Sequence, residues 1–179
     1  MRKRIAIAAL LFAVPRWAPA QNADHHYHGQ GYLFLADGAS NPASYQFGGG
    51  GEWLFNKGFG LASEIERSTQ FWSGTTLNTW IGSTDLSYHF GSSTKNRKLE
   101  PFVTSGYTFF YVSGITLPHD NGANFGGGLN IWLKGHAALR LEIRDSFGGR
   151  NASAEFEPSG TTYLLPQHLV SFRIGVTFR

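Results

Sequence analysis

The chain contains no cysteine, and beyond its first twenty residues it contains no long apolar run. The absence of cysteine excludes disulfides, a thiol nucleophile and a thiolate metal site. A membrane-spanning helix needs about 20 consecutive apolar residues, and a leucine-rich pattern of helical spacing is also missing. If this chain enters a membrane, it must therefore cross as β-strands.

The first twenty residues carry a pattern of their own. A basic start at 2–4 precedes an apolar run at 5–14, and residues 18–20 have the small-x-small form of a cleavage site. We interpret 1–20 as a secretory signal peptide that is too short to span a bilayer, and 21–179 as the mature domain. The missing cysteine excludes processing as a lipoprotein.

Removal of the predicted signal peptide changes the charge of the chain. Four of the 15 basic residues lie within it, which leaves 11 basic against 12 acidic residues, a net charge of −1 in place of +3. We therefore predict no nucleic-acid partner. The basic cluster at Lys95, Arg97 and Lys98 lies in a Ser- and Asn-rich stretch, which we interpret as a solvated turn.

Glycine and aromatic residues are abundant, and they form a hairpin pattern that occurs twice, 78 residues apart. Phe-Gly-Gly-Gly begins at Phe47 and again at Phe125, and each copy continues through Trp-Leu and a very short turn to Glu-Ile, at 64–65 and 142–143. Each copy predicts two strands with alternating apolar and polar residues. A repeated up-and-down hairpin behind an export signal is typical of a small outer-membrane β-barrel.

The whole mature chain divides into segments that alternate in this way. The eight segments are 28–36, 43–55, 59–68, 77–90, 100–112, 123–133, 137–147 and 167–178. Short polar turns, near 56–58, 91–98 and 134–136, alternate with longer or irregular connections, near 37–42, 69–76, 113–122 and 148–166. We predict an all-β fold, an eight-stranded antiparallel up-and-down transmembrane β-barrel with its short turns and both termini in the periplasm.

Alternation alone does not separate a membrane barrel from a soluble one, because the two differ in which face is inside. The aromatic residues favour the membrane, because they gather near the strand ends in two bands, as at two membrane interfaces. Toward the short turns lie Trp53, Phe55, Phe59, Tyr88, Phe90, Trp132 and Phe178; toward the longer connections lie Tyr45, Phe71, Trp72, Phe109, Tyr111 and Phe147. A soluble periplasmic ligand-binding barrel is the alternative. The first strand is apolar on both faces over 31–35, which leaves its orientation open.

In a membrane barrel the same alternation directs charged side chains into the lumen. They are Glu52, Glu64, Glu66, Asp85, Arg140, Glu142, Arg144 and Arg173. Eight strands enclose only enough room for side chains, and a buried charge without a partner is costly. We predict a lumen ion-pair network that plugs the barrel. A narrow gated pore, in which these pairs rearrange, is the alternative.

Two stretches resemble a known family. Gly-Gly-Gly followed by Leu-x-Lys-Gly and Leu-Arg-Leu-Glu-Ile-Arg, over 126–144, is similar to the sixth and seventh strands of the OmpA-like outer-membrane β-barrel family, and 171–179 resembles its eighth strand. The resemblance implies an integral outer-membrane barrel inserted by periplasmic chaperones and the barrel-assembly machinery. Such barrels usually end on an aromatic residue, whereas Arg179 follows Phe178 here. We expect no peptidoglycan-binding domain and hence no cell-wall tether.

An enzymatic alternative also comes from resemblance. Some eight-stranded barrels deacylate lipid A with a Ser/His pair, and their His-x-Ser-Asn signature falls on the seventh strand. The matching stretch here contains Asp145 and Ser146 but no preceding histidine, and His119 or His168 would have to approach from neighbouring loops. We therefore predict that the chain is not an enzyme.

Two further segments carry weaker signals. The group His25-His26-Tyr27-His28 has metal-binding residue types, but we interpret it as an irregular periplasmic end and predict no metal and no cofactor. The segment 149–166 contains apolar residues among Gly, Ser and Thr, which suit either the lipid headgroups or an extracellular partner. The predicted function is structural, or that of a scaffold for surface loops, in contact with outer-membrane lipids.

Overall fold

The barrel wall is built from long strands. The computed structural model describes residues 28–39, 44–55, 58–72, 75–90, 98–112, 119–134, 136–148, 153–156, 161–164 and 168–179. Their strands are β1 (His28–Gly38), β2 (Ser44–Phe55), β3 (Phe59–Trp72), β4 (Thr75–His89), β5 (Leu99–Val112), β6 (His119–Lys134), β7 (Ala137–Gly148), β8 (Ser153–Phe156), β9 (Thr161–Leu164) and β10 (His168–Phe178). The predicted signal peptide and His25 to Tyr27 lie outside the described residues.

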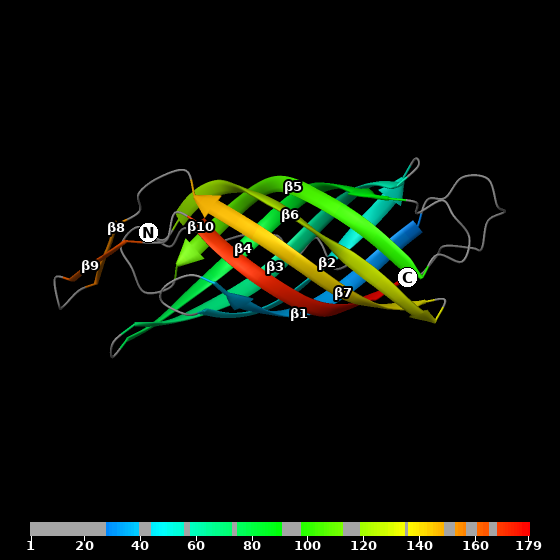
Figure 1. Ribbon diagram of the computed structural model, residues 1–179. Helices are drawn as coiled ribbons and strands as arrows, with labels where there is room; N and C mark the ends of the chain where they lie inside the picture. The colour runs from blue at the N-terminus through cyan, green and yellow to red at the C-terminus, as the bar shows by residue number, and fades with distance from the viewer. Residues whose placement is uncertain are drawn as a thin grey trace, which may run out of the picture.

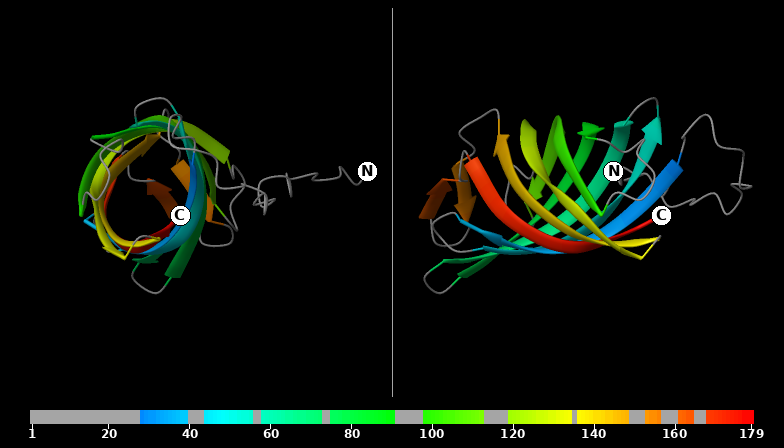
Figure 2. Two further views of the ribbon diagram at one scale, coloured as in Figure 1. Left: turned by 90° about the vertical axis from the view of Figure 1, so that its right-hand side faces the viewer. Right: turned by 45° about the vertical axis from the view of Figure 1, so that its right-hand side comes forward.

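Eight of these strands close into one antiparallel barrel, in the order β1-β10-β7-β6-β5-β4-β3-β2 (Figure 1). The ring closes where β1 pairs with β10, from Gly31 opposite Phe178 to Gly38 opposite Ser171. Viewed from its end, the wall forms a complete ring (Figure 2). The predicted eight-stranded up-and-down barrel is therefore confirmed. None of the described residues forms a helix long and apolar enough to cross a membrane.

The strands continue further toward the loops than the sequence predicted. The connection expected at 69–76 is mostly strand, because β3 runs to Trp72 and β4 starts at Thr75. Polar residues suggested a loop there, but they alternate as in the rest of the wall, with Gln70 buried and Phe71 outside. The segment expected to be a long loop at 148–166 contains the separate two-stranded sheet β8–β9, at the end of the barrel away from the C-terminus (Figure 1).

The wall has its apolar face outside and its polar face inside, which is the arrangement of a membrane barrel. In β1, whose orientation the sequence left open, Leu33 and Leu35 are 63% and 65% exposed, whereas Tyr32 and Phe34 face the interior. A soluble ligand-binding barrel would reverse these faces. The outward aromatics contact one another near the strand ends, as in the pairs Phe59–Tyr88 and Tyr45–Phe71.

Trp132 does not lie in the outer aromatic band in which the sequence predicted it. Trp132 is 7% exposed and faces the interior, whereas Trp53 is 58% exposed on the outer surface. In the strand pairing Trp132 lies opposite Ala138, as Leu54 lies opposite Gly60. Trp132 lies 79 residues after Trp53, whereas the repeat has an offset of 78 residues. Because side chains alternate between the two faces of a strand, this shift by one position turns Trp132 to the opposite face.

Candidate functional site

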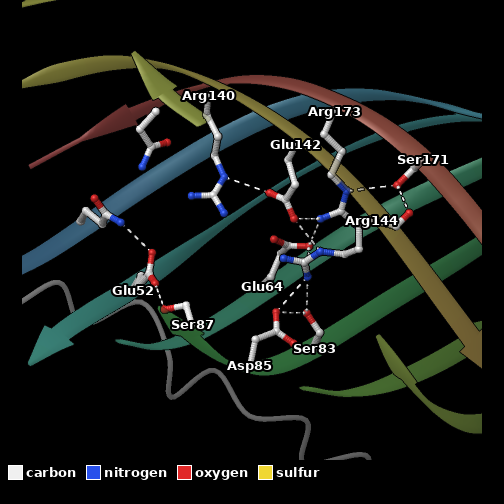
Figure 3. A network of polar contacts seen from close by, with 12 residues as sticks. Glu52, Glu64, Ser83, Asp85, Ser87, Arg140, Glu142, Arg144, Ser171 and Arg173 are labelled. Atoms are coloured by element: carbon white, nitrogen blue, oxygen red, sulfur yellow. Dashed lines mark hydrogen bonds and ion pairs between the residues drawn. The ribbon is translucent and has the colours of Figure 1, made fainter. Parts of the chain in front are cut away.

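The structure places all eight charged residues of the predicted lumen network inside the barrel, and all are buried. Glu52 lies on β2, Glu64 and Glu66 on β3, Asp85 on β4, Arg140, Glu142 and Arg144 on β7, and Arg173 on β10. They alternate with apolar outward residues because neighbouring side chains of a strand point to opposite faces. Most of them meet in one network inside the barrel (Figure 3).

Arg144 is the centre of this network. Its Nη1 lies 2.8 Å from Asp85 Oδ2 and 3.4 Å from Glu64 Oε1, and its Nε donates to Glu142 Oε1 at 2.7 Å. The three carboxylates come from β4, β3 and β7. One guanidinium therefore joins three strands through the lumen, using the donors that its planar fork supplies.

Arg173 makes a second set of ion pairs beside the first. Its Nη1 lies 2.7 Å from Glu64 Oε1, and its Nη2 lies 2.6 Å from Glu66 Oε2. Its Nη1 also lies 3.7 Å from Glu142 Oε1. Glu64 and Glu142 are thus shared between Arg144 and Arg173, so the two guanidiniums belong to one continuous network.

Arg140 connects the network to aromatic side chains. Its Nε donates to Glu142 Oε2 at 3.0 Å, and its guanidinium carbon lies 4.4 Å from the ring centre of Tyr32 and 4.0 Å from that of Phe102. A buried guanidinium between two aromatic faces gains cation–π attraction. Arg140 therefore fills space as well as carrying charge.

The glycine repeat makes room for these aromatic rings. Tyr32 of β1 lies opposite Gly50 in the strand pairing, and Phe102 of β5 lies opposite Gly128, the corresponding residue of the second copy. A Cβ atom on Gly50 would meet the Tyr32 hydroxyl at 2.7 Å, and one on Gly128 would meet Phe102 Cζ at 2.7 Å. A ring that lies over a strand glycine covers backbone that would otherwise lack a packing partner.

Sequence analysis missed a second cluster nearer the short turns. His89 of β4 has Nδ1 2.7 Å from Glu100 Oε1 and Nε2 3.0 Å from Glu52 Oε1. Two carboxylates on the two ring nitrogens are both satisfied only by the doubly protonated imidazolium. Gln30 donates to Glu52 at 2.6 Å, and the Trp132 indole donates to Glu100 at 3.3 Å. Ser87 also bonds Glu52.

The sequence indicates this cluster only weakly. His89 lies on the polar face of the predicted fourth strand, beside Asp85, yet histidine alone does not indicate an ion pair. Glu100 is the first residue of the predicted strand 100–112 and precedes Pro101, so no alternation before it indicates its face. The contact of Glu100 with His89 depends on the register of β4 and β5, which places His89 opposite Phe102.

The residues considered for catalysis do not assemble. Ser146 is buried inside the barrel, whereas His168 and Asp145 face outward, where His168 Nδ1 lies 2.8 Å from Asp145 Oδ2. The wall of the barrel therefore separates Ser146 from His168, so His168 cannot serve as its base. The side chain of His119 is not among those described. Among the described residues, no group of three or more His, Asp and Glu is placed to hold a metal ion.

The fold and its interior define a small membrane β-barrel whose lumen is filled with paired charges. The sequence matches no protein-family model and no curated protein. Similar solved structures include the N-terminal β-barrel domain of OprF from Pseudomonas aeruginosa, with 18% identity and a TM-score of 0.60 over 87% of this chain and 98% of that one.

Two further solved structures share the fold. The outer membrane protein OprG from Pseudomonas aeruginosa has 12% identity and a TM-score of 0.63 over 84% of this chain and 94% of that one. The outer membrane enzyme PagL has 10% identity and a TM-score of 0.51 over 82% of this chain and 98% of that one. At these identities the likeness concerns the fold alone, and it confirms the predicted resemblance to OmpA-like barrels at that level.

Proposed function

We propose that this chain is a non-enzymatic barrel of the outer membrane, closed to ions by its own side chains, that serves as a scaffold for its extracellular loops. The outer-membrane location is supported by the apolar outer face and by the solved barrels that share the fold. The observation that carries the closed lumen is the set of ion pairs made by Arg144 and Arg173.

These ion pairs cross the barrel. The strands β7 and β3 stand on opposite sides of the eight-membered ring, and Arg144 reaches Glu64 across it. Asp85, Glu142 and Glu66 complete the layer, and the side chains of all these residues are buried. Since an eight-stranded barrel has room only for side chains, a layer of paired charges at mid-height leaves no continuous path for ions.

The closed lumen is tested by single-channel recording in planar bilayers. The wild-type barrel is expected to be silent, whereas the double variant Glu142→Ala/Arg144→Ala removes the centre of the layer and is expected to conduct. Leu141→Ala, on the lipid-facing side of the same strand, is the matched control and should stay silent. Discrete conductance by the folded wild type would contradict the closed lumen and favour the gated pore.

The scaffold role concerns the segment between β7 and β10, which carries β8 and β9. On intact cells, added protease is expected to cut the wild type between 149 and 167, because this segment lies at the end opposite the short turns. Replacement of 149–166 by a short turn should leave a folded, uncut barrel. Protection of this segment on intact cells, with cleavage only after the outer membrane is opened, would reverse the proposed orientation.

A further inference from the structure

The outer face of the barrel carries an arginine among apolar residues. Arg140, Arg144 and Arg173 face the lumen, whereas Arg67 of β3 faces outward. In the strand pairing Arg67 lies between Phe47 and Trp80, and its guanidinium carbon is 5.8 Å from the ring centre of Trp80. A charge on the lipid-facing side is costly at mid-membrane and tolerated near the interface.

The height of Arg67 on its strand matches the outer interface. It lies eight residues beyond Phe59, which belongs to the aromatic band at the short turns. At about 3.3 Å per residue and a tilt of about 40°, this places its Cα about 20 Å along the axis, near the upper limit of an apolar band about 25 Å tall. The long side chain can extend its charged end further toward the headgroups.

Arg67 and its neighbours present hydrogen-bond donors. Arg67 Nη2 donates to Asn78 Oδ1 at 3.0 Å, and Thr69 Oγ1 donates to the same oxygen at 3.0 Å. Since a guanidinium can only donate, the amide oxygen must face Arg67, and the two hydrogens on Asn78 Nδ2 are directed elsewhere. Arg67 Nε is buried, and no atom of the described residues accepts a hydrogen bond from it.

The positive charge of Arg67 is also not neutralised within the wall. None of the ion pairs formed by the described residues includes Arg67, and the adjacent Glu66 faces the lumen, where it pairs with Arg173. A cation, an amide N–H pair and flanking aromatic rings at a membrane interface together suit an anionic headgroup. Guanidinium donors match the oxygens of a phosphate especially well.

We propose that Arg67 and Asn78, with Thr69 holding the amide in place, form a binding site for a phosphate group of lipid A, the glycolipid of the outer leaflet. Trp80 and Phe47 would then contact the apolar part of the same lipid. The site requires the proposed outer-membrane location but is independent of whether the lumen conducts. It assigns a specific lipid contact to the outer wall, apart from the lumen and the loops.

Native mass spectrometry of the detergent-solubilised barrel tests this site. Bisphosphorylated lipid A is added in parallel with its dephosphorylated form, and the wild type is expected to retain the phosphorylated form on the order of tenfold more. Arg67→Gln and Asn78→Asp should each abolish that preference, whereas Arg67→Lys should keep part of it. His168→Gln, which alters an imidazole elsewhere on the outer face, is the control and should keep it in full.

Unboiled and boiled samples of each variant are compared on a denaturing gel. A heat-dependent shift in mobility establishes that the variant is folded before its bound lipids are counted. Equal retention of both lipid A forms by the wild type, or an unchanged preference in folded Arg67→Gln, would overturn the proposal. Preferential retention of phosphatidylglycerol over lipid A would overturn its assignment to the outer leaflet. A conducting wild-type barrel that still selects phosphorylated lipid A would reject the closed lumen and leave this site standing.

Discussion

Arg144 and Glu64 meet across the barrel: their strands stand opposite each other in the ring, and Nη1 of one lies 3.4 Å from Oε1 of the other. The same guanidinium makes its shorter contacts with Asp85 and Glu142. A single side chain therefore holds together parts of the wall that share no backbone hydrogen bonds. The predictions below follow from this network and from the packing around it.

Replacing Arg144 with methionine should destabilise the barrel by about 3–5 kcal/mol, because buried carboxylates would lose their partner. Urea unfolding in lipid vesicles measures the change. Arg67→Met is the matched control, the same substitution on the outer face, and should change the free energy of unfolding by less than about 1 kcal/mol. Equal effects of the two substitutions would show that the network contributes little to stability.

Gly128→Ala should destabilise the barrel by about 1–3 kcal/mol, because the new methyl group would overlap Phe102 and the carbonyl of Leu141. Gly82→Ala is the control, since a Cβ atom at Gly82 meets nothing within 4 Å. That substitution should be neutral or slightly stabilising. Thermal unfolding followed by the gel mobility shift distinguishes the two, and a harmless Gly128→Ala would refute the packing of Phe102 over glycine.

His89→Gln should cost about 2–4 kcal/mol, because Glu52 and Glu100 would face each other without a cation between them. Adding Glu100→Gln to that variant should recover part of the loss, since it removes one of the two unpaired charges. A double-mutant cycle of unfolding free energies measures this coupling. Strictly additive effects would show that His89 and Glu100 do not act as a pair.

Single-tryptophan variants should report that Trp53 and Trp132 lie on opposite faces of the barrel wall. Fluorescence from Trp53 is expected to be strongly quenched by brominated lipids, because its ring lies on the outer surface. Fluorescence from Trp132 is expected to be protected, because its ring lies in the lumen and donates to Glu100. Strong quenching of Trp132 would place it in the outer aromatic band that the sequence first indicated.

The sequence carried enough information for the fold and for the central charges. Strand alternation is a period of two, so each charged residue of β7 and β10 was assigned to a face from its immediate neighbours, as with Arg140, Glu142 and Arg173. The strand ends were less predictable. A polar residue such as Gln70 suits a loop as well as a polar barrel interior, and only the pairing of β3 with β4 places it in the wall.

The remaining parts of the site depend on contacts between distant strands. Glu100 and Trp132 are brought together by the pairing of β5 with β6, and Trp132 faces the lumen because it stands one position later in its copy of the repeat than Trp53 does in the first. The Arg67 site likewise requires Asn78 of β4 to lie opposite Thr69 of β3. Such relationships follow from strand register, which a local pattern of residues does not specify.

Arg173 has a consequence for how the barrel stays closed. It belongs to the last strand of the ring, and its partners Glu64 and Glu66 belong to β3, so these ion pairs pass over the junction between β1 and β10. A sideways parting of the wall at that junction would have to separate these pairs as well as the backbone hydrogen bonds of the two strands. We therefore expect no lateral gate at this junction. A lipid should contact the outer wall of this protein and should not enter its interior.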